Sequence, residues 1–210
     1  MARDWVAWHE DYETLTPLAR RLAIVQDQVE VALVARGETP IHVLSLCSGE
    51  GRDLVVPLTA RAPATNVTGR LVELDPTLAG RARSAIAAAG LTGLEVVEGD
   101  AGTTASFDGA VPADLVLVCG VFGNISDEDI EGTIRALPML CAAGATVIWT
   151  RHRGAPDLTP AIRRWFAASG FRHQAFVRVP DSTGSVGVER FVGTPAPLAV
   201  GVPLFRFRDE

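Results

Sequence analysis

The chain has 210 residues, 48% of them hydrophobic, and a formal net charge of −6 at pH 7. This length suits one medium-sized domain with a sizeable core, and the acidic balance argues against a general nucleic-acid binder. No apolar run is long enough to span a membrane, and residues 1–5 lack the apolar core of a secretory signal. We therefore expect a compact cytoplasmic α/β protein that binds neither nucleic acid nor membrane.

The three cysteines, Cys47, Cys119 and Cys141, are odd in number and lie far apart in the sequence. They show no pairing of the kind that metal sites use, so we expect reduced, mostly buried thiols and no metal centre. The sequence contains no internal repeat and no low-complexity linker. It therefore favours a single domain over residues 1–210.

Residues 1–37 are predicted to form an N-terminal helical cap. The side chains of Trp5, Trp8 and Tyr12 share one helical face, and Pro17 suits the first turn of a second helix with a 3.6-residue apolar period. Two interpretations stay open. Either the helix pair packs on the sheet edge, or the three aromatic side chains form a lid that contacts the substrate.

From residue 41 onwards, short apolar runs alternate with amphipathic segments. The expected strands cover residues 41–46, 67–74, 94–98, 113–119 and 145–150, and the expected helices cover residues 53–61, 76–89, 126–141 and 158–169. Residues 171–179 and 185–192 are two further β-type runs, joined by a loop with hairpin chemistry. This order predicts a doubly wound, mostly parallel, seven-stranded sheet with a C-terminal antiparallel hairpin.

The first expected strand ends in Ser48-Gly49-Glu50-Gly51, just before a helix. Glycine permits backbone angles that other residues avoid, and its missing Cβ lets a ligand approach the main chain. The helix that follows offers unpaired N–H groups and a positive dipole end. Such a turn is typical of a ligand-binding loop, but it does not identify the ligand.

Two carboxylates are expected at the same edge of the sheet, where parallel strands end. Glu73 ends the second strand, and Asp100 follows the third. A carboxylate about twenty residues after the glycines is positioned to accept both hydroxyls of a ribose, and Asp100 could accept from the exocyclic amine of an adenine. The combination indicates an adenosine-containing ligand.

A dinucleotide fingerprint needs a third small residue where Leu54 stands. The stretch Leu-Cys-Ser-Gly-Glu-Gly at 46–51 instead resembles the first motif of class I S-adenosylmethionine-dependent methyltransferases. Residues 73–76, 99–101 and 113–124 are similar to the second, third and fourth motifs of that family. The resemblance covers roughly residues 41–193, which would form the cofactor-binding core, with residues 194–210 as a C-terminal tail.

The resemblance implies S-adenosylmethionine as the cofactor. In the family's pattern Glu73 takes the ribose-binding place, and Asp100 and Ala101 form the adenine contact. Phe122 is expected to pack on the cofactor. The implied cofactor-binding residues are Cys47, Ser48, Gly49, Glu50, Gly51, Glu73, Leu74, Asp100, Ala101, Cys119, Gly120 and Phe122.

The sequence departs from the family's pattern at Ser45, where many members have an acidic residue in the first strand. Contact with the amino group of the cofactor must then come from backbone carbonyls near residues 47–49 or from elsewhere. Glu50 is the nearest substitute, unless it simply faces water. Asp53 is expected in the first helical turn, where the helix dipole favours a carboxylate without any ligand role.

Methyl transfer from a sulfonium is an in-line displacement that depends on near-attack geometry, helped where needed by a base. We expect Asn124 to orient the substrate or the methionine part of the cofactor, unless it only makes a turn. His152 is a candidate general base, and Arg151 and Arg153 are candidates for holding an anionic substrate, unless this loop is simply solvated.

These expectations combine into an S-adenosylmethionine-dependent methyltransferase that acts on a small molecule. The chain lacks the Asn/Asp-Pro-Pro-Tyr-type motif of amino-nucleobase methyltransferases after the fourth strand, which counts against DNA or RNA as substrate. Two alternatives remain: a non-catalytic protein that binds S-adenosylmethionine and, with less support, an NAD(P)-dependent oxidoreductase. The sequence leaves the oligomeric state open.

Overall fold

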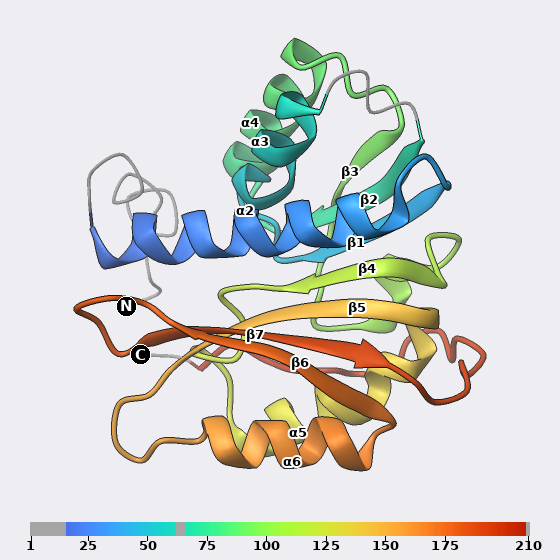
Figure 1. Ribbon diagram of the computed structural model, residues 1–210. Helices are drawn as coiled ribbons and strands as arrows, with labels where there is room; N and C mark the ends of the chain where they lie inside the picture. The colour runs from blue at the N-terminus through green and yellow to red at the C-terminus, as the bar shows by residue number, and fades with distance from the viewer. Residues whose placement is uncertain (1–15, 62–65, 209–210) are drawn as a thin grey trace.

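The computed structural model describes residues 16–61 and 66–208. A seven-stranded sheet with the order β3-β2-β1-β4-β5-β7-β6 lies between two layers of helices (Figure 1). The strands are β1 (Ile41–Leu46), β2 (Val67–Glu73), β3 (Leu94–Glu98), β4 (Ala113–Val118), β5 (Cys141–His152), β6 (Phe171–Arg178) and β7 (Gly184–Phe191). The α-helices are α2 (Pro17–Arg36), α3 (Arg52–Ala60), α4 (Pro76–Ala88), α5 (Asp127–Ala136) and α6 (Thr159–Ala168), with short 3₁₀ turns η2 (Thr104–Phe107) and η3 (Leu137–Met139).

The strand pairing confirms the predicted fold class. β3, β2, β1, β4 and β5 pair in parallel, whereas β7 is antiparallel to both β5 and β6. The chain moves outward from β1 in one direction through β2 and β3, and then in the other through β4 and β5. The carboxyl ends of β1 and β4 therefore flank the topological switch point, where doubly wound sheets bind their ligands.

Two apolar clusters cover the two faces of the sheet. Helices α2, α3 and α4 lie over one face, and α5 and α6 lie over the other (Figure 1). Trp149 on β5 is fully buried and stacks on Phe166 of α6, with the ring centroids 5.9 Å apart. Aromatic burial of this size is a large contribution to the core.

Helix α2 lies across a face of the sheet, which corrects the expectation that it packs on the sheet edge. Its buried residues Val25, Val29 and Leu33 belong to the same apolar cluster as Ile148 of β5 and Val186 of β7. Burying each such side chain stabilises the fold by about 1.5–3 kcal/mol, so the helix is a part of the core. The predicted aromatic lid residues Trp5, Trp8 and Tyr12 lie outside the described residues.

The helix predicted over 126–141 is shorter in the structure. Helix α5 ends at Ala136, a 3₁₀ turn follows, and Cys141 already belongs to β5. Pro138 explains the early end, because proline lacks the N–H group that would continue the helical hydrogen bonds. The C-terminal tail contributes two isolated bridges, Thr103 to Pro203 and Ile125 to Phe207.

The tail nevertheless packs tightly over the carboxyl-end loops. Leu204 and Phe205 are buried, and the N–H of Leu204 donates to the carbonyl oxygen of Gly102 at 2.7 Å. The N–H of Arg208 donates to the carbonyl oxygen of Asn124 at 2.9 Å. The tail is therefore part of the wall around the ligand edge of the sheet. Within residues 16–61 and 66–208, no helix is long and apolar enough to cross a membrane.

Candidate functional site

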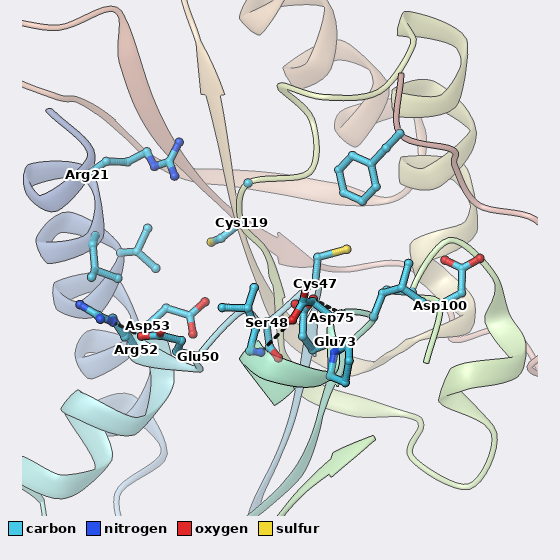
Figure 2. A pocket seen from close by; sticks show the side chains of 18 residues that line it. Arg21, Cys47, Ser48, Glu50, Arg52, Asp53, Glu73, Asp75, Asp100 and Cys119 are labelled. Carbon is cyan, nitrogen blue, oxygen red and sulfur yellow. Dashed lines mark hydrogen bonds and ion pairs between the residues drawn. The ribbon is translucent and has the colours of Figure 1, made fainter. Parts of the chain in front are cut away.

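A cavity of about 380 Å³ opens at the carboxyl ends of β1 and β2 (Figure 2). This volume lies in the range of small-molecule pockets. Nine of the predicted cofactor-binding residues line it: Cys47, Ser48, Glu50, Glu73, Leu74, Asp100, Ala101, Cys119 and Gly120. The structure thus brings together residues from four separate strand-end loops.

The two glycines of the first loop shape the turn but do not line the cavity. Gly51 is the left-handed N-cap of α3, with φ of +71°, and an added Cβ would lie 2.7 Å from Leu71 Cδ2. A side chain at this position would therefore both strain the backbone and collide with the core. Gly49 also has a positive φ, and its N–H points to Glu73.

Glu73 is held in place by two backbone donors. Its Oε2 accepts from the N–H of Gly49 at 2.7 Å, and its Oε1 accepts from the N–H of Asp75 at 2.9 Å. Each carboxylate oxygen can accept further hydrogen bonds. The buried side chain lines the cavity, so its remaining acceptor sites are placed to meet ligand hydroxyls.

Asp100 and Ser48 lie on opposite sides of Glu73 (Figure 2). Asp100 Oδ1 accepts from the N–H of Gly102 at 2.7 Å, which fixes the turn after β3. Leu74, 65% exposed, and Phe207 of the tail, 37% exposed, also line this cavity. Their apolar surfaces beside a carboxylate suit a flat base with an amino group.

Part of the cavity wall comes from residues that carry no predicted binding role. The additional lining residues are Arg21, Leu22, Val25, Arg52, Asp53, Asp75, Pro76, Leu78 and Phe207. Arg21, Leu22 and Val25 come from α2 and Phe207 from the tail, and neither segment contains a local motif that would have revealed a site. Asp53 could have been found, because it follows the glycine turn by only two residues.

Asp53, which was expected only to favour the helix dipole, also lines the cavity. It lies beside Glu50 and Arg52 at the end of the cavity remote from Asp100 (Figure 2). It is 9% exposed, and its Oδ1 is buried without a hydrogen-bond partner. Burial raises the pKa of this carboxyl to about 7.

Glu50 also lines the cavity, but two arginines neutralise it. Its Oε2 accepts from Arg52 Nε at 2.6 Å, and its Oε1 accepts from Arg81 Nη1 at 2.8 Å. Glu50 is therefore less suited than Asp53 to pair with a positive group of a ligand. Burial also raises the pKa of the thiols of Cys47 and Cys119, so both line the cavity as neutral groups at physiological pH.

A second cavity of about 360 Å³ adjoins the first. The residues that line it are Arg21, Gly120, Gly123, Asn124, Thr150, Arg151, His152 and Gly184, of which Arg21 and Gly120 also line the first cavity. The wall contains two arginines and no carboxylate. Three predicted residues, Asn124, Arg151 and His152, therefore face one space next to the candidate cofactor cavity.

Arg151 is an almost buried cation, 8% exposed. It donates a hydrogen bond to the carbonyl oxygen of Phe122, while its Nε is buried without a partner. No carboxylate of residues 16–61 or 66–208 forms an ion pair with it. Burial lowers the pKa of Arg151, because the charged form is poorly solvated. Such a side chain is suited to receive an anion.

His152 and Asn124 are both engaged by the backbone. The N–H of Gly154 donates to His152 Nδ1 at 3.2 Å, so the neutral ring carries its proton on Nε2. Burial and the charge of Arg151 lower the pKa of His152. Asn124 Nδ2 donates to the carbonyl oxygen of Gly120 at 2.6 Å, which fixes the loop after β4. This His152 geometry favours a hydrogen-bond donor over a general base.

Two predicted residues lie elsewhere. Phe122 is fully buried against Trp149 and Phe166, and it lines neither cavity, so its placement does not fit the expected packing on the cofactor. The ring belongs to the apolar cluster that also contains Val121 and Ile125. Arg153 donates to the carbonyl oxygen of Ser182 at 2.8 Å and holds the hairpin loop instead of lining a cavity.

No protein-family model matches the sequence, and a search of curated proteins also finds no match. Solved structures do match. An O-methyltransferase family protein from Burkholderia thailandensis is 19% identical, with a TM-score of 0.62 over 80% of this chain and 56% of that one. Magnesium protoporphyrin IX methyltransferase from Synechocystis PCC 6803, solved with bound S-adenosylmethionine, is 13% identical, with a TM-score of 0.66 over 82% and 80% of the two chains.

A third match is precorrin-6y C5,15-methyltransferase from Geobacter metallireducens GS-15. It is 12% identical, with a TM-score of 0.59 over 80% of this chain and 86% of that one. The chain thus spans little more than half of the Burkholderia protein but most of the other two. At these identities the likeness shows the fold alone.

Proposed function

From the class I methyltransferase fold that it shares with these structures, we propose that the protein is an S-adenosylmethionine-dependent methyltransferase acting on a small anionic molecule. The observation that carries the proposal is the Glu73 carboxylate, held by Gly49 and Asp75 in the wall of the first cavity. A carboxylate fixed in this way at the end of β2 suits the two hydroxyls of a ribose.

The order of groups along the first cavity supports an adenosine ligand with a charged extension. Asp100 lies at one end, Glu73 and Ser48 lie in the middle, and Asp53 lies at the other end (Figure 2). Adenine at Asp100 and ribose at Glu73 would direct the 5′ substituent towards the Asp53 end, past Gly120, which lines both cavities. In this arrangement the methyl group would lie where the two cavities meet.

The second cavity is the proposed acceptor site. Arg151 would bind an anionic group of the acceptor, since it is a buried cation without a carboxylate partner among the described residues. His152 Nε2–H would add a hydrogen bond, and Asn124 would act as a positioning residue through Gly120. The acceptor class that fits is a small molecule with a carboxylate or a similarly compact anion.

Bound S-adenosylmethionine would supply an electrophilic methyl group, whose bond to sulfur breaks with its electron pair left on sulfur. The acceptor lone pair forms the new bond to carbon, and if the nucleophilic atom was protonated, its proton passes to solvent water. The protein acts by holding the acceptor in line through Arg151. His152 Nδ1 already accepts from the N–H of Gly154, so this atom is not placed to take that proton.

Two other functions are less well supported. Leu54 is fully buried, and it occupies the position where a dinucleotide fold needs a small residue for close helix packing. This observation argues against an NAD(P)-dependent oxidoreductase. A non-catalytic S-adenosylmethionine-binding protein would have no need for the adjoining cavity with Arg151 and His152.

The test is methyl transfer from methyl-labelled S-adenosylmethionine to a panel of small aromatic and aliphatic acids, each paired with its neutral amide. We expect label in the product of at least one acid and less in the matched amide. Cofactor binding without transfer to any member would favour the non-catalytic alternative. Equal methyl transfer to the amides and to the acids would show that the acceptor does not need an anionic group.

A further inference from the structure

Asp53 has an unusual position for a charged side chain. It lies in the first turn of α3, and its Oδ1 is buried with no hydrogen-bond partner, yet the side chain lines the first cavity. A buried carboxylate without a partner destabilises a folded protein by several kcal/mol if it is charged. The backbone N–H groups of residues 53 and 54 at the start of α3 account for a carboxyl in this turn, but they leave its Oδ1 without a partner.

The surrounding charges leave Asp53 as the available anion at this end of the cavity. Glu50 is paired with Arg52 and Arg81, and Glu73 is held by backbone donors near the middle. Arg21 of α2 lines the same cavity, as does the thiol of Cys119. A positive ligand group that entered this end would therefore meet the Asp53 carboxylate.

Ser45 matters for Asp53 because it leaves the first strand without an acid that could bind a positive ligand group. Strand β1 has no acidic side chain facing the cavity, and Ser45 is buried with its Oγ unpartnered. The 5′ end of an adenosine ligand placed by Asp100 and Glu73 would extend away from Asp100, towards the Asp53 end (Figure 2). The positive group that this ligand carries at its far end is the α-ammonium of its methionine part.

We propose that Asp53 binds the α-ammonium group of the cofactor, and that its carboxylate makes ligand recognition depend on pH. This inference rests on the proposed S-adenosylmethionine site. It assigns to the start of α3 an acid that the first strand lacks. The pairing supplies the missing partner of Oδ1 and favours the charged form of Asp53.

The pH dependence follows from burial. In the free protein the pKa of Asp53 is raised to about 7, and a bound ammonium lowers it again. Binding of an ammonium ligand at pH 6 therefore releases about one proton and is up to about tenfold weaker than at pH 7.5. Because Cys119, Glu50 and Glu73 border the same space, proton release is measured against a variant that lacks only the Asp53 charge.

The experiment compares three ligands by calorimetry, with wild type and Asp53→Asn. S-adenosylhomocysteine carries the ammonium and the carboxylate, decarboxylated S-adenosylhomocysteine carries the ammonium alone, and 5′-methylthioadenosine carries neither. We expect Asp53→Asn to weaken the first two by about 10- to 100-fold, to leave the third unchanged and to abolish proton release at pH 6.

Glu128→Gln is the matched control, since it neutralises an exposed first-turn carboxylate of α5 away from both cavities. It should leave all three affinities unchanged. Equal weakening of all three ligands by Asp53→Asn would give Asp53 a structural role only and overturn the inference. If wild type binds none of the ligands, the proposed function itself fails. If wild type binds S-adenosylhomocysteine and Asp53→Asn binds it equally well, only the Asp53 assignment fails.

Discussion

Oε2 of Glu73 accepts a hydrogen bond from the N–H of Gly49 at 2.7 Å. This bond joins the turn after β1 to the end of β2 across 24 residues of sequence. The same carboxylate also fixes Asp75, the N-cap of α4, whose Oδ1 accepts from the N–H groups of Thr77 and Leu78. One side chain thus shapes two loops of the candidate cofactor cavity.

Glu73→Ala should therefore lower both stability and cofactor affinity. The N–H of Gly49 loses its buried acceptor, which costs about 1–3 kcal/mol of the free energy of unfolding. Affinity for S-adenosylhomocysteine should fall at least about tenfold, because the ribose also loses its acceptor. Denaturant unfolding and calorimetry measure the two effects. Glu95→Ala, which removes an exposed partner of Arg70, is the control and should change neither by more than a small amount.

Gly51→Ala should destabilise the protein by about 2–4 kcal/mol, since it combines a left-handed backbone with a collision at Leu71. Gly109→Ala is the matched control, because Gly109 has φ of +75° but no atom within 4 Å of an added Cβ. It should cost only about 1–2 kcal/mol. Urea unfolding measures the free energy of unfolding of both variants. An equal loss of stability in the two would show that the collision with Leu71 contributes nothing.

Asp53→Asn should stabilise the ligand-free protein at high pH while it weakens cofactor binding. The folded-state pKa of Asp53 is raised, so wild type loses stability relative to the variant as the pH rises from the unfolded value near 4 through about 7. The difference should be small at pH 4 and reach up to about 4 kcal/mol above pH 8. Melting temperatures at several pH values test this, and a constant difference across pH would refute it.

Arg151→Met should impair the acceptor and spare the cofactor. With an acid that is methylated by wild type, we expect KM for the acid to rise at least about tenfold, because a buried charge-assisted contact is lost. Affinity for S-adenosylhomocysteine should stay within about twofold. Arg153→Met is the control, since Arg153 contacts the hairpin loop and not the cavity. Similar KM changes in both variants would contradict the assignment of Arg151.

His152→Gln separates a donor from a base. A donor role predicts a loss of less than about tenfold in kcat and an unchanged pH profile, whereas a general base contributes about 10²–10⁴-fold. The pKa of His152 lies below the ordinary value of histidine. If His152 were a general base, the activity of the wild type would therefore decline only when the pH falls below that ordinary value. Steady-state rates between pH 5 and 9 distinguish these outcomes.

The strand and helix order could be predicted because apolar periodicity and glycine turns are local signals. The same is true of Glu73 and Asp100, which stand at strand ends that any parallel sheet brings to one edge. The end of α5 was misplaced because the apolar pattern continues through Pro138 into β5. Here the backbone chemistry of one residue outweighed the periodicity.

The cavity walls from α2 and the tail could not be predicted, because their contacts depend on tertiary packing between distant segments. Arg21 and Phe207 approach the same cavity from opposite ends of the described chain. Phe122 lies within a predicted motif, but the motif does not determine whether its ring faces the cavity or the core. The sequence does not distinguish Asp53 from an ordinary first-turn carboxylate at a helix end, and only its burial in the fold reveals that Oδ1 lacks a partner.

The most direct test of the central claim is a calorimetric titration of the wild-type protein with S-adenosylhomocysteine and, separately, with NAD at pH 7.5. We expect saturable one-to-one binding of S-adenosylhomocysteine and no binding of NAD at the same concentration. Binding of NAD without binding of S-adenosylhomocysteine would contradict the account.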